Sequence, residues 1–249
     1  MYKGQGVQLH YDISFDNYIM GTCIPRWFYN RSAYHMKLDA FVIYVKGKAD
    51  NVADRCVESG KKHGVHVTKV PGHTPETLDI DAYFAEHNLP QTAFHERYSR
   101  IDPVRCAFAS HHTLWRQCAE GKNAYLILEH DAVFVNQLPN TIIGNIVNLG
   151  KPSYGKYKTP TLGESRLVSK QYLPGAHGYM VTPFGAKLLL HRAHVDAGPT
   201  DVFIHNERFP GKITECYPWP IECKDSFTTI QNETGCLAKH NYDDGYQII

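Results

Sequence analysis

The sequence predicts an α/β fold, a single domain with a mostly parallel central sheet flanked by helices. Residues 40–45 form a short β-branched and aromatic run, residues 51–63 follow with helical spacing and stop before Gly64, and residues 65–70 form a second apolar run. This strand–helix–strand order predicts parallel strands covered by helices. A later predicted strand ends in two acids, at the sheet edge where α/β proteins bind ligands.

The composition sets limits on the function. The chain has 249 residues, of which 43% are hydrophobic, enough for a buried core. No apolar run approaches the roughly 18 residues of a membrane span, so we expect no membrane span. The 26 Lys and Arg residues nearly balance the 25 Asp and Glu residues, so no global positive field attracts nucleic acid. The overall composition does not exclude a local basic patch.

The cysteines and the N-terminus bear on localisation. The sequence opens with MYKGQG, which lacks the apolar core of a secretory signal. Its 7 cysteines are odd in number and never occur as Cys-x-x-Cys, which argues against a disulfide framework and a thiolate zinc site. We therefore expect a cytoplasmic protein. Residues 1–38 are aromatic and turn-rich, and we treat them as an arm preceding a domain of residues 39–249.

The remaining elements follow in order. Residues 104–120 are the best predicted helix, with His111 on its apolar stripe and Gly121 at its end. Residues 124–128 and 178–181 are predicted to be strands, and residues 132–135 form a second apolar run after the first of them. Thr182 and Pro183 then resemble a helix cap and first helical position, with the helix reaching residue 192. Residues 150–171 are polar and rich in turn formers, so we expect a long mobile loop.

The acidic strand end is the most informative local feature. Along an extended backbone Glu129 and Asp131 point to one side, while His130 points to the other. Two carboxylates there can hold a divalent metal that bridges a diphosphate, or hydrogen-bond a ribose. The alternative is a solvated turn or a helix cap.

Four ordered blocks carry a family resemblance. Residues 105–115 (RCAFASHHTLW) and 124–131 (AYLILEHD) resemble glycosyltransferase family 25, which includes lipopolysaccharide-biosynthesis and collagen galactosyltransferases. That family shows a helix of the form G-C-x-x-S-H-x-x-x-W before a strand ending in E-D-D. Residues 175–189 (GAHGYMVTPFGAKLL) and 199–203 (PTDVF) are similar to two later blocks. The resemblance covers roughly residues 39–230.

The resemblance implies a GT-A-like nucleotide-sugar domain, a glycosyltransferase whose acidic motif binds Mn²⁺ or Mg²⁺ and the donor diphosphate. Glu129 and Asp131 match the first and last acids of that motif, and His130 replaces the middle acid. This departure weakens metal dependence more than donor binding. The implied donor is a UDP-sugar, and the default acceptor is a glycan or lipopolysaccharide.

Further residues are carried over from the same blocks. Ser110 and His111 match the Ser-His pair, and with Glu129, Asp131, Gly175 and His177 we assign them to the donor-binding side. We expect His111 to act as a buried histidine that braces the strand end. Gly175 and His177 belong to a segment where backbone could approach a sugar or phosphate, or simply turn before a strand. Asp201 matches the acid of the acceptor side, implying the base of an inverting transfer. Its alternative role is an N-cap for residues 202–206.

Other candidates rest on residue type alone. His205 and His240 could complete a metal shell, and we assign His240 with Glu129 and Asp131. Arg100 and Arg105 could offset diphosphate charge.

The arm leaves the acceptor open. Residues 26–37 interleave bases with aromatics, a mixture that stacks on nucleobases or sugars, or packs on the domain. A phage-type DNA glycosyltransferase acting on a hydroxymethylated base is therefore the second hypothesis. A non-catalytic module that binds sugar or nucleic acid is the third.

Overall fold

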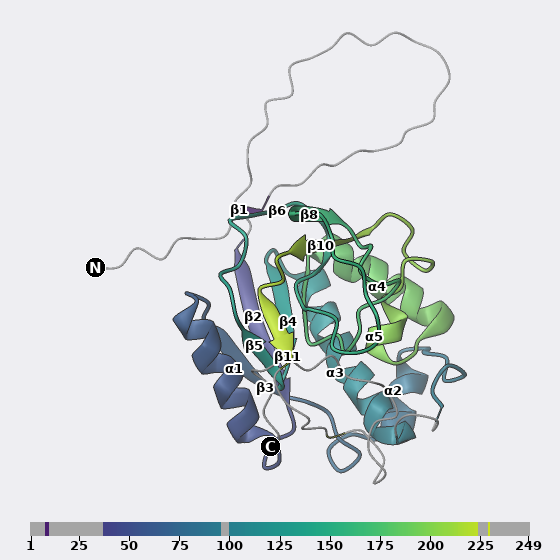
Figure 1. Cartoon of the computed structure of the whole chain (residues 1–249). Coiled ribbons are helices and arrows are strands. Elements are labelled where there is room, and N and C mark those ends of the chain that lie inside the picture. Colours follow the sequence, from purple (N-terminus) through teal and green to yellow (C-terminus); the bar gives the residue numbers. More distant parts are fainter. Residues whose placement is uncertain (1–7, 10–36, 96–99, 224–228, 230–249) are drawn as a thin grey trace, which may run out of the picture.

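The computed structural model describes residues 8–9, 37–95, 100–223 and 229 (Figure 1). Its helices are α1 Asp50–Lys62, α2 Ile80–Glu86, α3 Ile101–Glu120, α4 Pro183–Asp196 and α5 Thr200–Phe203. Its strands are β1 Gln8–Leu9, β2 Leu38–Tyr44, β3 Val67–Pro71, β4 Ala124–Glu129, β5 Ala132–Phe134, β6 Thr141–Ile142, β7 Ile146–Asn148, β8 Gly163–Arg166, β9 Gly178–Val181, β10 Ile213–Tyr217 and β11 Ile221–Cys223.

A seven-stranded sheet forms the centre, in the order β3-β2-β4-β9-β7-β10-β8. Strands β3, β2 and β4 are parallel, and β9 lies antiparallel between β4 and β7. Strand β10 is parallel to β7, and β8 is antiparallel to β10. Five strands thus share one direction, which confirms the predicted α/β class with a mostly parallel sheet.

Helices cover both faces of this sheet. Leu126 and Leu128 of β4 belong to the core that contains Cys56 of α1. Ile127 between them belongs to the core that contains Phe108 of α3, because successive side chains of a strand alternate between faces. Figure 1 shows α1 on one side of the sheet and α2 to α5 on the other.

The predicted caps of α4 are confirmed. Thr182 Oγ1 accepts a hydrogen bond from the Gly185 backbone N–H at 3.0 Å, and Pro183 is the first helical residue. Gly185 lets α4 approach the loop before β7, since a Cβ at this position would overlap the Asn145 carbonyl oxygen. The helix continues to Asp196, one turn beyond the predicted end at residue 192.

A second small sheet returns the chain to the end of β4. Strand β11 pairs antiparallel with β5, with Cys223 opposite Ala132. This pairing brings the last described strand beside Asp131. The site therefore includes a segment about 90 residues away in the sequence.

The expectation of an uninterrupted loop over residues 150–171 is wrong. Strand β8 lies within this segment and pairs with β10. The fully buried carboxylate of Glu215 in β10 also accepts hydrogen bonds from the Val168 and Ser169 backbone N–H groups at 2.7 and 2.8 Å. Long-range contacts of this kind leave no periodic signal in a polar sequence, so the pattern could not reveal them.

Most of the expected arm lies outside the described residues. Two of its residues, Gln8 and Leu9, form β1 and pair with β6 in parallel. Within the described part of the chain, no helix combines the length and apolar character needed to cross a bilayer.

Candidate functional site

Two carboxylates, Asp131 and Asp201, act electrostatically on Glu129 at the carboxyl end of β4. Glu129 is the last residue of β4, Asp131 lies in the turn that leads to β5, and Asp201 is in α5. Burial first, then the negative charge of Asp131 and, to a smaller extent, that of Asp201 together raise the pKa of Glu129 to about 8, while His130 acts in the opposite direction. Residues about 70 positions apart thus share one electrostatic environment.

The extended backbone assumed for the predicted alternation of side chains ends at Glu129. The strand ends at this residue, and His130 and Asp131 form a turn, so the period of two does not extend to them. Glu129 Oε1 lies 3.2 Å from His111 Nε2, and its side chain keeps 29% exposure. Asp131 Oδ2 instead accepts a hydrogen bond from Cys223 Sγ at 3.0 Å. The two acids remain electrostatic neighbours although different elements hold them.

A buried aromatic network supports Glu129 from α3 and β9. Trp115 Nε1 donates to the Tyr179 hydroxyl at 2.7 Å, and this hydroxyl lies 2.9 Å from His111 Nδ1. All three side chains are buried. Burial lowers the pKa of His111 to about 3, with Asp201 acting weakly in the opposite direction. The structure therefore places His111 as a buried brace at the strand end.

Asp201 is held by two donors. Its Oδ2 accepts from the Tyr154 hydroxyl at 2.6 Å, and its Oδ1 accepts from the Val202 backbone N–H at 2.9 Å. Burial raises the pKa of Asp201 while these hydrogen bonds oppose the rise. The alternative of an N-cap is wrong, because Pro199 occupies that position and Asp201 is already helical.

Ser110 lies on the same helix as His111 but performs a different task. Its hydroxyl donates to the Cys106 carbonyl oxygen and accepts from the His73 backbone N–H, both at 2.8 Å. It thereby fastens the loop after β3 to α3. None of its hydrogen bonds reaches the three carboxylates.

Gly175 and His177 lie in the segment that leads directly into β9. Gly175 has φ +82°, and a Cβ there would lie 2.6 Å from Ser153 Oγ. His177 is 2% exposed, and neither ring nitrogen has a hydrogen-bond partner among the described residues. Its carbonyl oxygen accepts from the Glu129 backbone N–H at 3.2 Å, so the segment fixes the end of β4 through its backbone.

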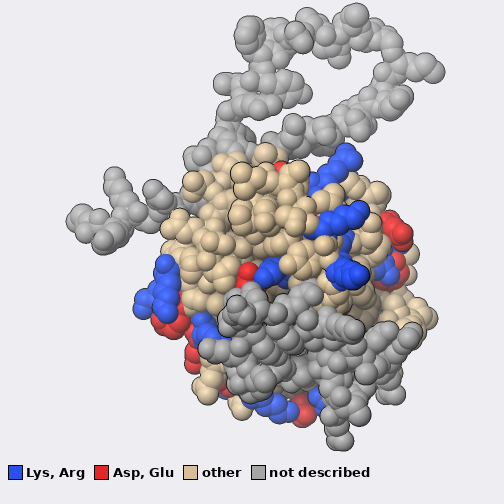
Figure 2. All heavy atoms as spheres, in the orientation of Figure 1, with Lys and Arg blue, Asp and Glu red and all other residues tan. Residues whose placement is uncertain are grey.

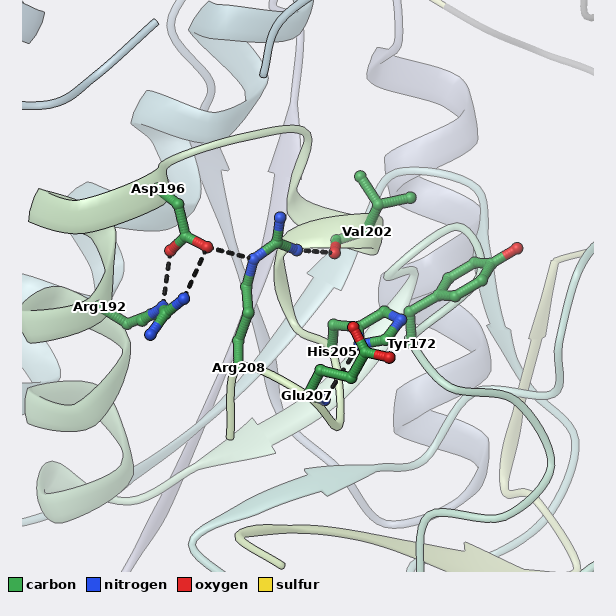
Figure 3. A pocket seen from close by; sticks show the side chains of 7 residues that line it. All are labelled: Tyr172, Arg192, Asp196, Val202, His205, Glu207 and Arg208. Carbon is green, nitrogen blue, oxygen red and sulfur yellow. Dashed lines mark hydrogen bonds and ion pairs between the residues drawn. The ribbon is translucent and has the colours of Figure 1, made fainter. Parts of the chain in front are cut away.

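His205 does not join the acids. Its ring stacks on Tyr172 with centroids 6.1 Å apart, and it lines a separate hollow of about 480 Å³ (Figure 3). Arg192 and Arg208 converge there on Asp196 from two sides, with hydrogen bonds of 2.6–2.9 Å. This triad links α4 to the segment after α5.

The two arginine candidates serve other contacts. Arg105 is 5% exposed and forms ion pairs with Asp102 and Asp81 at 3.0 and 2.5 Å. Arg100 donates to the Thr229 carbonyl oxygen at 2.8 Å. Figure 2 shows Lys and Arg side chains in several groups on the visible face, separated by neutral surface.

Glu129 and Asp131 suit a cation that is held jointly by the protein and a ligand's phosphates better than one held by protein side chains alone. Asp131 Oδ1 is buried and has no hydrogen-bond partner among the described residues. No cluster of three His, Cys, Asp or Glu side chains suited to a metal occurs within those residues, and His240 lies outside them. Mg²⁺-like ions are commonly held by one or two carboxylates plus substrate phosphates. Glu129 and Asp131 meet that requirement.

Three supporting residues escaped the sequence analysis. Tyr154 lies in the segment taken for a loop, and Cys223 follows a stretch without periodicity. Tyr179 lies in a quoted block, but its strand position gave no indication of a buried polar partner. The network becomes visible only when the Tyr179 hydroxyl is found beside the buried His111 and Trp115. The fold creates this proximity, and the sequence does not reveal it.

No family model matches the sequence, and no curated protein matches it. The geometry nevertheless unites the four sequence blocks. His111 of the first block contacts Glu129 of the second block and Tyr179 of the third block. Asp201 of the fourth block raises the pKa of Glu129.

Proposed function

We propose that this chain is a glycosyltransferase with a GT-A-like domain that moves a sugar from a nucleotide-sugar donor, a UDP-sugar by resemblance, to an acceptor hydroxyl. The electrostatic effect of Asp131 and Asp201 on Glu129 carries the proposal. Acids that interact electrostatically at the carboxyl end of a central strand, with the pKa values of two of them raised, are typical of a functional site.

Glu129 and Asp131 form the donor side of the proposed site. Their mutual repulsion, expressed in the raised pKa of Glu129, is relieved when a divalent cation binds. Such a cation, Mn²⁺ or Mg²⁺, would neutralise charge on the departing diphosphate. Asp131 Oδ1 and the exposed part of Glu129 are the groups available to hold it.

Asp201 forms the acceptor side. As the acceptor oxygen attacks the anomeric carbon, its proton passes to the Asp201 carboxylate, and the bond between this carbon and the diphosphate breaks with its electron pair leaving on the diphosphate. The Tyr154 hydroxyl at 2.6 Å holds the carboxylate in place. Burial raises the pKa of Asp201, which makes the carboxylate a better base.

The test is hydrolysis and transfer from a panel of UDP-sugars by the full chain, with Mn²⁺ and with EDTA. The proposal expects UDP release that depends on a particular sugar and rises with Mn²⁺. A chain that binds a UDP-sugar but never releases UDP, with any acceptor or metal, would instead be a binding module.

A further inference from the structure

A chain of hydrogen bonds runs from Trp115 through Tyr179 and His111 to Glu129. Its first member, the Trp115 indole, can only donate a hydrogen bond. The indole Nε1–H of Trp115 lies 2.7 Å from the Tyr179 hydroxyl oxygen. An indole has no acceptor, so this hydroxyl oxygen is the acceptor of that bond. The hydroxyl hydrogen must then point elsewhere.

The other partner of the Tyr179 hydroxyl is His111 Nδ1, at 2.9 Å. If Nδ1 carried a hydrogen, the hydroxyl would accept two bonds and its own hydrogen would have no acceptor in a fully buried site. The hydroxyl therefore donates to Nδ1. A neutral imidazole that accepts at Nδ1 carries its hydrogen at Nε2.

His111 Nε2 faces Glu129 Oε1 at 3.2 Å. We propose that Trp115, Tyr179 and His111 are positioning residues that direct an N–H at Glu129 Oε1 and leave Glu129 Oε2 for the ligand. Oε2 has no hydrogen-bond partner among the described residues, and the side chain keeps 29% exposure. The ligand group facing Glu129 is then a cation or a hydroxyl donor.

The direction of the hydrogen bonds stands by itself, whereas the role of the chain in ligand binding rests on the proposed function. The experiment separates the two. Full-length protein labelled with ¹⁵N in histidine is examined by NMR for the tautomer of His111, whose signals are assigned by their loss in His111→Gln. The expected signature is a protonated Nε2 and an unprotonated Nδ1 in the wild type. A protonated Nδ1 overturns the proposal.

The second arm uses Tyr179→Phe, which removes the hydroxyl but keeps the ring. We expect the tautomer preference to weaken and the affinity for Mn²⁺ with UDP, measured by calorimetry, to fall about 10-fold or more. Tyr125→Phe is the matched control, since that half-buried hydroxyl on β4 has no hydrogen bond among the described residues. An unchanged tautomer in Tyr179→Phe contradicts the chain of donors. If the wild type binds no Mn²⁺ with UDP, the proposed function fails while the tautomer still tests the chain.

Discussion

The Asp131 carboxylate has one oxygen bonded to Cys223 and the other buried without a hydrogen-bond partner among the described residues. Asp131→Asn should therefore lower transfer by about 10²-fold or more, because charge neutralisation of the diphosphate is lost. Its melting temperature should stay near that of the wild type. His130→Ala should reduce transfer far less, since it removes no carboxylate. Wild-type rates for Asp131→Asn with saturating Mn²⁺ would refute the donor assignment.

Asp201 should affect turnover more than binding. In Asp201→Asn the side-chain oxygen still accepts from the Tyr154 hydroxyl, so we expect the local structure to persist. Loss of the base should lower kcat by about 10²-fold while donor affinity changes little. Steady-state kinetics and donor titration measure the two effects separately. A collapse of donor affinity would move Asp201 to the donor side and make Glu207 the next base candidate, because two arginines already engage Asp196.

Glu129 makes stability depend on pH. Its pKa of about 8 in the folded chain exceeds the value near 4.5 of a free Glu, so the folded state binds the proton more tightly. The free energy of unfolding therefore falls as pH rises from about 4.5 to about 8. Glu129→Gln should abolish this loss and be more stable than the wild type at pH 8.5, by about 1 kcal/mol or more. Urea unfolding at pH 5 and 8.5 measures it, with exposed Glu58→Gln as control. Equal pH dependence in the wild type and Glu129→Gln would contradict the raised pKa.

At the scale of elements, α4 depends on a close approach to the loop before β7. A Cβ at Gly185 would overlap the Asn145 carbonyl oxygen, and a backbone atom cannot rotate away. Gly185→Ala should therefore destabilise the chain by about 1–3 kcal/mol despite its better helix propensity. Lys187→Ala, on the exposed face of the same helix, should change stability little. Chemical denaturation compares the two, and a Gly185→Ala variant as stable as the wild type would show that the approach is looser.

The elements with strong periodicity could be predicted, whereas several of the shortest strands could not. The apolar spacing around His111 and the cap at Thr182 identified α3 and α4, because local chemistry determines them. Strands β7 and β11 have three residues each, too few for a period, and sheet pairing alone defines them. Glu129 and Asp131 were predicted from their position at the end of β4, and Asp201 was predicted from the family resemblance. Their donors, Cys223 and Tyr154, come from segments that only the fold brings there.

At the scale of the whole molecule, positive and negative charges nearly balance. Binding of a DNA acceptor would therefore depend on the cations of the N-terminal arm. Residues 26–36, which carry Arg26 and Arg31, lie outside the described residues, and Lys37 pairs with Asp39 at 3.4 Å. If hydroxymethylated DNA is the acceptor, its affinity should fall steeply with salt, because cations that contact phosphates release counterions. Neutralising Arg26, Arg31 and Lys37 should reduce that slope. Binding by a salt series in wild type and variant measures it, and no association at low salt eliminates DNA as acceptor.

The central claim is that the acids at the end of β4 bind a nucleotide sugar. A thermal-shift screen of UDP-sugars with Mn²⁺, run on the wild type and on an Asp131→Asn/Glu129→Gln double variant, tests it most directly. A ligand that binds only the folded state at 100 times its Kd stabilises by about 2.7 kcal/mol. We predict that at least one UDP-sugar raises the wild-type melting temperature by several degrees and leaves the double variant unshifted. Equal shifts in both proteins, or none in the wild type with any UDP-sugar, would contradict the claim.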